Sequence, residues 1–369
     1  MNHPSNRLPL IDAFKAIAAQ LIVLHHLASY GPLSVAAHQL VPGTADWLFD
    51  YGRMAVQVFL VIGGFLAARG LSASGQALAG SPLPLIWKRY VRLVIPYLAA
   101  IAFAIACSAI AHHWIDDPAI PARATFKQWL AHAFMLQNLL GFNALSAGLW
   151  YVAIDFQLFA LMALLLWAGH RRYLAPALVL GVAASSLFWF NRDQSWDHWA
   201  LYFFGSYGLG AAAWWASERR QFAAWLGIIA TVAIAALALD FRLRIALALC
   251  VALVLGFGRR SGVLESWPNV RPLAFLGRIS FSIFLVHFPI YLLANTLFVK
   301  LGLTTPGAAM LGILGAWAAS IAGGTLFYRW VESPAASQRI AVTIGWPFGK
   351  LREQANRLPG LLTLIVRRA

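Results

Sequence analysis

The sequence predicts an all-α integral membrane protein built as a bundle of about ten transmembrane helices. Of its 369 residues, 61% are hydrophobic and only 11% are charged, and the mean hydropathy is +0.70. Soluble domains carry about 25% charged residues. Apolar runs of about 20 residues, the length that crosses a bilayer, alternate with short polar segments. These runs are continuous, so they indicate helices and not the alternating strands of a barrel.

The expected spans follow from the apolar runs and from the Pro, Gly and charge clusters between them. They lie at 11–31, 53–70, 91–112, 148–168, 173–190, 199–216, 222–240, 243–257, 277–298 and 308–330. Residues 126–141 are also helical in pattern. They are too short and polar to cross, and we expect an interfacial or re-entrant helix there.

The net charge of +15 comes from Lys and Arg in alternate loops, which favours a membrane protein over a nucleic-acid-binding one. With a cytoplasmic N-terminus, 20 of these residues lie inside, 7 lie outside and Lys15 falls within a span, which together are all 28. The positive-inside rule therefore predicts that both termini are cytoplasmic.

One membrane domain is expected over residues 1–337, followed by a basic cytoplasmic tail at 338–369. The tail alternates Lys or Arg with apolar residues and is broken by Pro347 and Pro359, so we expect it to lie on membrane lipids of the anionic inner leaflet. Cys107 and Cys250 each lie in apolar stretches, which indicates packing and no disulfide framework.

The first span carries four ionisable residues, which are costly in a membrane and are candidates for function. Lys15 and His26 are eleven positions apart, so they point within about 20° of each other and are separated by a rise of about 16 Å. Asp12 lies within about 60° of Lys15, whereas His25 points about 80° away from it. We expect His26 to be functional and His25 to make an interhelical hydrogen bond.

Six ordered segments resemble motifs of the membrane-bound acyltransferase 3 family. The first is KAIAAQLIVLHH, in which Lys15 is followed by ten residues and then His26. The family usually has Arg at the position of Lys15. Lysine keeps the charge but lacks the bidentate fork. The others are VQVFLVIGGFLAARG with Gly63 where serine is common, WKRYVRLVIPY with Lys88, Arg89 and Arg92 before Pro96, GLWYVAIDFQLFAL with Asp155 where Glu is usual, LGRISFSIFLVHFPI with His287, and YRWVESP at 328–334.

This resemblance implies an O-acyltransferase of the bacterial plasma (inner) membrane. Its donor would be a cytosolic acyl-CoA, most simply acetyl-CoA, with no tightly bound cofactor. Its acceptor would be a hydroxyl of a cell-surface glycan or a lipid-linked sugar. Histidine suits this chemistry because its pKa starts near neutrality, so His26 is the expected general base.

The remaining polar residues have expected roles around that base. Asp155, or less favourably Asp12, would hold the imidazole and stabilise its charged form. Lys15, Arg89 and Arg92 would bind the donor's phosphates. The carboxylate of Asp155 could instead form a salt bridge between helices, and the arginines could serve only topology and lipid headgroups. We expect His287 to have a structural or acceptor-side role.

One other reading of the function stays open from the sequence. A proton-coupled transporter of a glycan or lipid could use Lys15, His26, Asp12 and Asp155 as a relay, and release of CoA would separate it from an acyltransferase. No metal site is expected, because His112 and His113 lack spaced partners. Outer-loop aromatics could stack on sugars or form an interfacial belt; they are Trp114, Trp129, Trp196 and Trp199.

Overall fold

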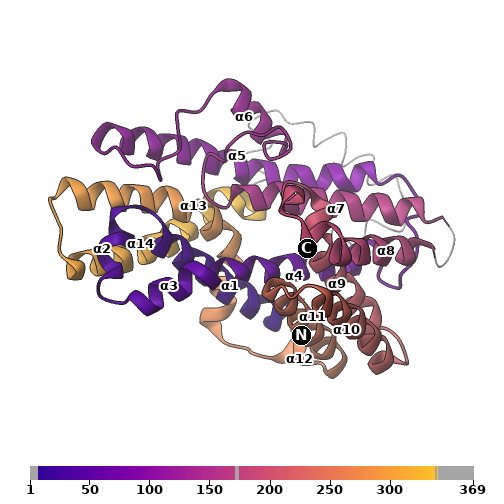
Figure 1. The fold of residues 1–369 in the computed structure, drawn as a ribbon. Coiled ribbons are helices and arrows are strands. Elements are labelled where there is room, and N and C mark those ends of the chain that lie inside the picture. The colour runs from indigo at the N-terminus through magenta and orange to yellow at the C-terminus, as the bar shows by residue number, and fades with distance from the viewer. Residues whose placement is uncertain (1–6, 171–173, 337–338, 340–369) are drawn as a thin grey trace, which may run out of the picture.

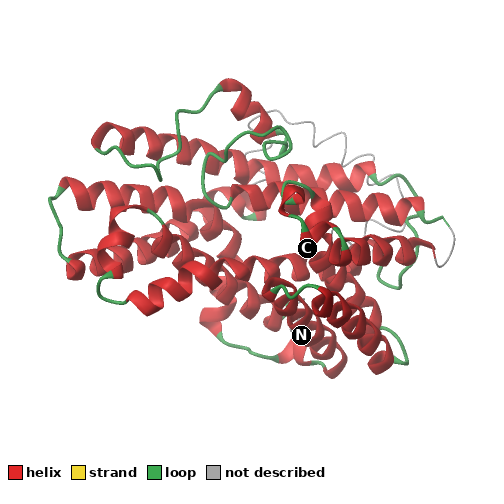
Figure 2. Cartoon of the chain, in the orientation of Figure 1, coloured by secondary structure: helices red, strands yellow, loops and turns green. Residues whose placement is uncertain are grey.

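A computed structural model describes residues 7–170, 174–336 and 339. Figure 2 shows these residues as helices joined by loops, and none of them forms a strand. The all-α architecture predicted from the sequence is therefore confirmed. The predicted tail at 338–369 lies, apart from residue 339, outside the described residues.

Ten helices correspond to the ten expected spans. They are α1 (Pro9–Ser29), α4 (Val56–Leu71), α5 (Leu83–Trp114), α7 (Leu149–Ala168), α8 (Leu174–Phe188), α9 (Ala200–Ser217), α10 (Phe222–Leu239), α11 (Leu243–Ser261), α13 (Arg271–Lys300) and α14 (Pro306–Phe327). Shorter elements join them: α2 (Gly31–His38), α3 (Pro42–Tyr51), η1 (Gly52–Ala55), α6 (Phe126–Ala133), η2 (Phe190–Arg192), η3 (Gln194–Trp196), α12 (Val263–Ser266) and the π-helical turn η4 (Tyr328–Glu332).

Eight helical stretches among the described residues are long and apolar enough to cross a membrane. One of them, Pro42–Leu71, joins α3, η1 and α4 into a stretch of 30 residues, longer than the span expected at 53–70. Neither α9 nor α11 is among the eight. Helix α11 carries three arginines, Arg244, Arg259 and Arg260, and α9 is rich in Gly, Tyr and Trp. The total of about ten crossings stays a prediction.

The helix expected over 126–141 is shorter than predicted. Helix α6 begins with a capping box, in which the Thr125 side chain accepts from the backbone N–H of Gln128, and it ends at Ala133. Met135 has a φ of 57°, a left-handed conformation that ends regular helix. The segment after Ala133 is therefore a series of turns, and only the eight residues of α6 are helical.

Figure 1 shows two groups of helices, with α2, α3, α13 and α14 on one side and α7 to α11 on the other. Helix α5 runs along both groups and packs on α13 and α7. Helix α4 connects them through its contacts with α1 and, most extensively, with α9. Helix α9 is enclosed by its neighbours, since every residue in it except Leu201 is buried.

Glycine allows α4 and α9 to approach closely. A Cβ atom on Gly64 would lie 1.8 Å from the carbonyl oxygen of Tyr207, and one on Gly210 would lie 2.0 Å from that of Val61. Small residues at such crossings let membrane helices pack backbone to backbone. This explains why α9 carries glycines and aromatics: its surface meets protein and not lipid.

Helices α1 and α13 form the second close contact, and it positions the candidate site. A Cβ atom on Gly277 would lie 2.2 Å from the carbonyl oxygen of Asp12. Further along, the Tyr291 hydroxyl donates to the carbonyl of Leu27 over 2.8 Å, and the side-chain oxygen of Asn295 accepts from the N–H of Leu33 over 2.9 Å. These polar contacts hold α13 against the end of α1 and against α2, which follows it.

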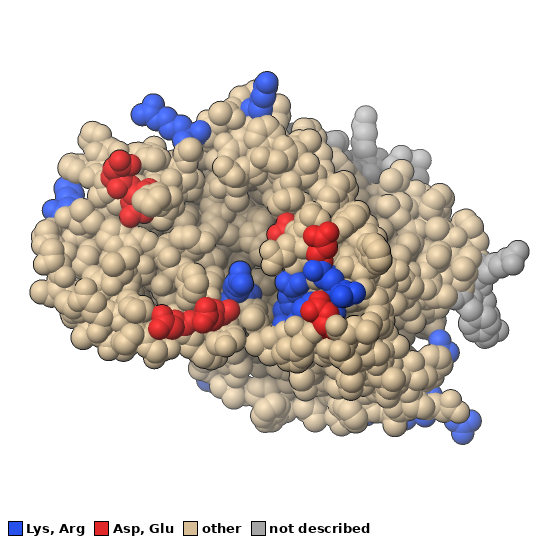
Figure 3. All heavy atoms as spheres, viewed as in Figure 1, with Lys and Arg blue, Asp and Glu red and all other residues tan. Residues whose placement is uncertain are grey.

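Figure 3 shows that most of the face seen in Figure 1 carries neither acidic nor basic side chains. The same face is hollowed near its middle, and charged side chains gather beside the hollow. A broad surface without charge is what contact with lipid hydrocarbon requires, because charged side chains in the bilayer are costly.

Candidate active site

His26 and His287 meet where α1 packs on α13. The Nδ1 atom of His26 lies 2.6 Å from Nε2 of His287. The two rings are nearly coplanar, with an angle of 7° between their planes, and their centroids are 4.9 Å apart. Because the centroids are much farther apart than the nitrogens, the rings meet edge to edge, as a hydrogen bond between imidazoles requires.

The hydrogen bonds of His287 decide which nitrogens carry protons. Its Nδ1 atom lies 2.8 Å from the carbonyl oxygen of Phe284 and 3.1 Å from that of Ile283. A carbonyl only accepts, so Nδ1 of His287 carries the proton and Nε2 of the neutral ring is an acceptor. His26 must then donate from Nδ1 to His287. This leaves Nε2 of His26 with a free lone pair, the state that a general base needs.

Aromatic side chains surround this pair. The His26 ring lies 5.7 Å from the Tyr30 ring and 6.3 Å from that of Phe288, while Phe284 packs 6.1 Å from His287. His26 is 8% exposed and His287 is fully buried. The pair therefore lies in an apolar setting in which few other groups can compete for its hydrogen bonds.

His25 points to a different neighbour. Its Nδ1 atom donates to the carbonyl oxygen of Leu48 in α3 over 2.9 Å, and its ring packs 6.3 Å from that of Phe49. This is the interhelical hydrogen bond expected of a membrane histidine. His25 thus ties α1 to α3, while His26 faces α13.

The carboxylate partner expected for His26 was wrong. Asp155 instead pairs with Arg89, with 2.5 Å between Oδ2 and Nη2, and Asp12 pairs with Arg7 over 3.3 Å. The reason lies in helix packing: α7, which carries Asp155, contacts α4, α5, α8 and α9, whereas α1 packs on α13. His287, expected in a structural or acceptor-side role, fills the place at His26. The alternative reading of Asp155 as an interhelical salt bridge matches the geometry.

Lys15 lies nearer the start of α1 than His26 and belongs to a second polar group. Its charged neighbours are Asp12, Glu332 and Arg92, contributed by α1, the π-helical turn η4 and α5. Arg92 is exposed and also lies within electrostatic range of Arg89, so the three cations expected to bind a donor are brought together. Arg89 differs from the other two because Asp155 already balances its charge.

Glu332 and Ser282 belong to this group and were not singled out from the sequence. The Ser282 hydroxyl donates to Oε2 of Glu332, which joins α13 to η4. Glu332 stands within the segment YRWVESP, and Ser282 within LGRISFSIFLVHFPI. Both segments were recognisable as motifs, but a motif does not show which of its polar residues faces the site.

The sequence matches the acyltransferase domain of the acyltransferase 3 family over residues 8–329. The chain belongs to the acyltransferase 3 family. No curated protein and no solved structure matches it. The match begins just before α1 and ends within η4, so it includes both histidines, Lys15 and Arg92, while Glu332 lies three residues beyond it.

The acyltransferase has a histidine with a free ring nitrogen and a lysine on α1, with Arg92 of α5 near the lysine. Its described residues include no group of three His, Cys, Asp or Glu able to hold a metal. Nε2 of His26 can take a proton from a hydroxyl. Lys15, near the start of α1, and Arg92 of α5 can bind an anion together. The arrangement thus suits transfer between two substrates that reach α1 from opposite ends.

Proposed function

We propose that this protein transfers an acyl group, most simply acetyl, from a cytosolic acyl-CoA to a hydroxyl of a glycan or lipid-linked sugar, with His26 as general base. The observation that carries the proposal is the hydrogen-bonded pair of His26 and His287 on packed membrane helices. This pair favours the tautomer of His26 that leaves Nε2 free, which supports a role as general base.

The reaction balances with one base. The acceptor oxygen attacks the thioester carbonyl carbon while its proton moves to Nε2 of His26. The tetrahedral intermediate then collapses, the carbon–sulfur bond breaks, and the thiolate takes the proton back from His26. The products are the O-acyl ester and free CoA. Throughout, the Nδ1–H of His26 remains bonded to His287, so the ring keeps its orientation while its charge changes.

The donor would bind with its phosphates at Lys15 and Arg92. The rise of about 16 Å between Lys15 and His26 is comparable to an extended pantetheine arm, so the thioester can reach His26 while the phosphates stay at the Lys15 end. Glu332 limits the local positive charge, and the Arg89–Asp155 pair holds α5 to α7 beside this route. Asp155 and Arg89 would therefore position the helices, while Lys15 and Arg92 would contact the donor.

The experiment is a mass balance on purified protein in sealed lipid vesicles with radiolabelled acetyl-CoA and a panel of sugars. An acyltransferase releases one free CoA thiol for each acetyl ester that appears on a sugar. A proton-coupled transporter, the other reading of the intramembrane charges, moves its solute across sealed vesicles without consuming the thioester. Transport with no CoA release would refute the proposal.

A further inference from the structure

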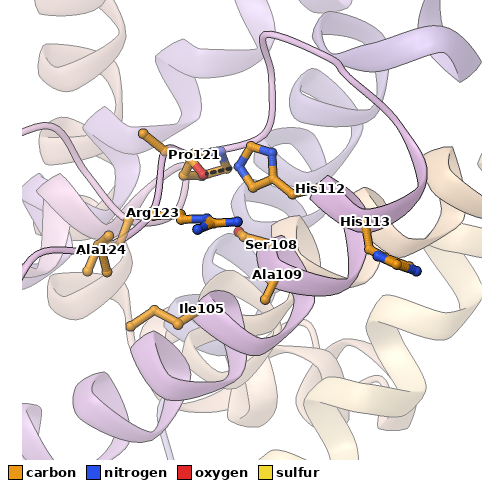
Figure 4. Close-up of a pocket in the computed structure, with 10 residues that line it drawn as sticks. Ile105, Ser108, Ala109, His112, His113, Pro121, Arg123 and Ala124 are labelled. Carbon is orange, nitrogen blue, oxygen red and sulfur yellow. Dashed lines mark hydrogen bonds between the residues drawn. The ribbon is translucent and has the colours of Figure 1, made fainter.

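A cavity of about 520 Å³ lies between the last turns of α5 and the segment that follows it. Figure 4 shows Ser108 and His112 projecting from the helix and Arg123 extending from the opposite segment toward the side of α5 that carries Ser108. The charge distribution predicts that this end of α5 is the outer one. The cavity therefore lies at the opposite end of the molecule from the Lys15 group.

Two polar side chains in this cavity are ready to bind a ligand. Ser108 is 7% exposed, and its hydroxyl has no hydrogen-bond partner among the described residues. Such groups are costly when buried and are normally satisfied. Arg123 is exposed, and within the described ranges no carboxylate pairs with its guanidinium. An unpaired guanidinium beside a free hydroxyl matches the needs of a carboxylate or phosphate group.

His112 adds an acceptor to these two donors. Its Nε2 atom donates to the carbonyl oxygen of Pro121 over 3.0 Å. Because the carbonyl can only accept, the neutral ring has its proton on Nε2 and a free lone pair on Nδ1. The cavity wall thus offers a charged donor, a hydroxyl and an imidazole acceptor, which suits a ligand with both an anionic group and hydroxyls.

One apolar layer separates the cavity from His26. Ala111 of α5 and Ile120 of the following segment pack against Phe288 and Leu292 of α13, with Tyr30 at their side. Tyr30 and Phe288 are the aromatic neighbours of His26. Ala111 and Ile120 adjoin the cavity-lining His112 and Pro121 in sequence. A molecule in the cavity therefore lies on the predicted outer side of His26, one apolar layer away from it.

We propose that this cavity binds the acceptor through an anionic group, a carboxylate or a phosphate, held by Arg123 and Ser108. The proposal rests on the function proposed above and narrows its acceptor to an acidic or phosphorylated sugar. The anion is fixed at Arg123, and the His112 ring accepts from a sugar hydroxyl. Another hydroxyl then extends toward His26, on the far side of the Tyr30 and Phe288 rings.

The test compares three probes that differ in charge: methyl β-glucuronide with a carboxylate, glucose 1-phosphate with a phosphate, and neutral methyl β-glucoside. Binding is measured by ligand-observed NMR on the full chain in nanodiscs. At least one anionic probe should bind about 10-fold more tightly than the glucoside, because hydrogen bonds to charged groups are stronger. Preference for the glucuronide would identify an acidic sugar, and preference for the phosphate a phosphorylated one.

Matched variants locate the effect. Arg123→Gln should lower the affinity for the preferred anionic probe to that for the glucoside. Ser108→Ala should lower the affinity for the same probe several-fold. Lys127→Gln removes an exposed cation from the neighbouring α6 and should change nothing. Equal binding of all three probes, absence of binding by any of them, or an Arg123→Gln protein that keeps the preference would overturn the proposal.

Acetyl-CoA turnover on the same preparations separates this failure from failure of the proposed function. If CoA is released with every sugar at equal KM and Arg123→Gln is unaffected, the function stands and the anion site is wrong. If the anionic probes bind through Arg123 while no sugar supports CoA release, the site stands and the acyltransfer proposal is wrong.

Discussion

At the scale of single residues, His26 is paired with a neutral imidazole where a carboxylate was expected. A carboxylate would stabilise the imidazolium by charge, but a buried charge needs its own partners and is costly to desolvate. His287 supplies a hydrogen-bond acceptor without that cost, and its own proton is held by two backbone carbonyls of α13. The orientation of His26 therefore depends on the backbone of α13 through one side chain.

We propose from this dependence that His287 is a positioning residue for His26. His287→Ala removes the acceptor for Nδ1–H of His26, so the ring is free to adopt the other tautomer. We expect kcat to fall by about 10²-fold, the lower end of what general-base assistance contributes, with KM for acetyl-CoA unchanged. His287→Gln offers a carbonyl oxygen as a new acceptor and should recover part of kcat. A residue needed only for packing would lose stability in both variants and would show no recovery with Gln.

Loss of Lys15 should affect donor binding and not the chemical step, because the lysine is expected to contact the donor's phosphates. Lys15→Ala should weaken acetyl-CoA binding by about 10-fold or more, and high donor concentration should restore most of kcat. Lys15→Arg should bind at least as well, since a fork replaces a point charge. Calorimetry with acetyl-CoA measures this directly. Unchanged affinity for acetyl-CoA in Lys15→Ala would mean that the lysine is not a donor ligand and instead balances the charge of Asp12 and Glu332.

At the scale of helices, the crossing of α4 and α9 is the most extensive helix–helix contact of the bundle. Besides the two glycines, a buried polar contact fixes its register: the Ser206 hydroxyl donates to the side-chain oxygen of Gln57 over 2.6 Å. Interhelical hydrogen bonds of this kind contribute modestly in membranes, whereas close packing of small residues contributes along the whole contact. The stability of the bundle should thus be sensitive to volume at this crossing.

Gly210→Ala tests that sensitivity. The added methyl group meets the Val61 carbonyl, a backbone atom of α4 that cannot move without shifting the helix. We expect a loss of about 1–3 kcal/mol in the free energy of unfolding, seen as a lower Tm in detergent. Gly227→Ala in α10 is the matched control, because nothing lies within 4 Å of the new methyl group. It should leave Tm unchanged or raise it, since alanine favours helix. Equal effects at both positions would contradict the packing account.

The helices themselves could be predicted because each apolar run is a local signal, and a helix of the described residues corresponds to each of the ten expected runs. The partner of His26 could not, because His26 and His287 are 261 residues apart and only helix packing brings them together. The same limit hid Glu332, which reaches the Lys15 group through a π-helical turn. The wheel of α1 did separate His25 from His26, since the angle between neighbours on one helix is fixed by its geometry.

At the scale of the whole molecule, the proposed reaction requires the Lys15 end to face the cytosol and the Arg123 cavity to face outward. This is the orientation that the distribution of Lys and Arg predicts. It places the acyl donor and the acceptor on opposite sides of the membrane, with His26 between them. The largely uncharged face seen in Figure 3 is compatible with a bundle held in lipid.

Cysteine labelling tests the orientation. In a background without Cys107 and Cys250, a cysteine at the exposed Asp116 should react with a membrane-impermeant maleimide on intact cells. A cysteine at the exposed Asn269, between α12 and α13, should react only after the membrane is broken. The reverse pattern would show that the protein has the opposite orientation, with the Arg123 cavity facing the cytosol.

The central claim is that His26 is the base of an acyl transfer, and neighbouring histidines on α1 allow it to be tested directly. CoA release is measured for His26→Ala and His25→Ala after both are shown to be inserted and to keep the parent Tm. We predict that His26→Ala loses roughly 10²–10⁴-fold in kcat, is not rescued by any donor concentration, and still binds acetyl-CoA. His25→Ala, which loses only the bond to Leu48, should keep most of its activity. A His26→Ala protein that transfers acetyl groups at the rate of His25→Ala would contradict the account.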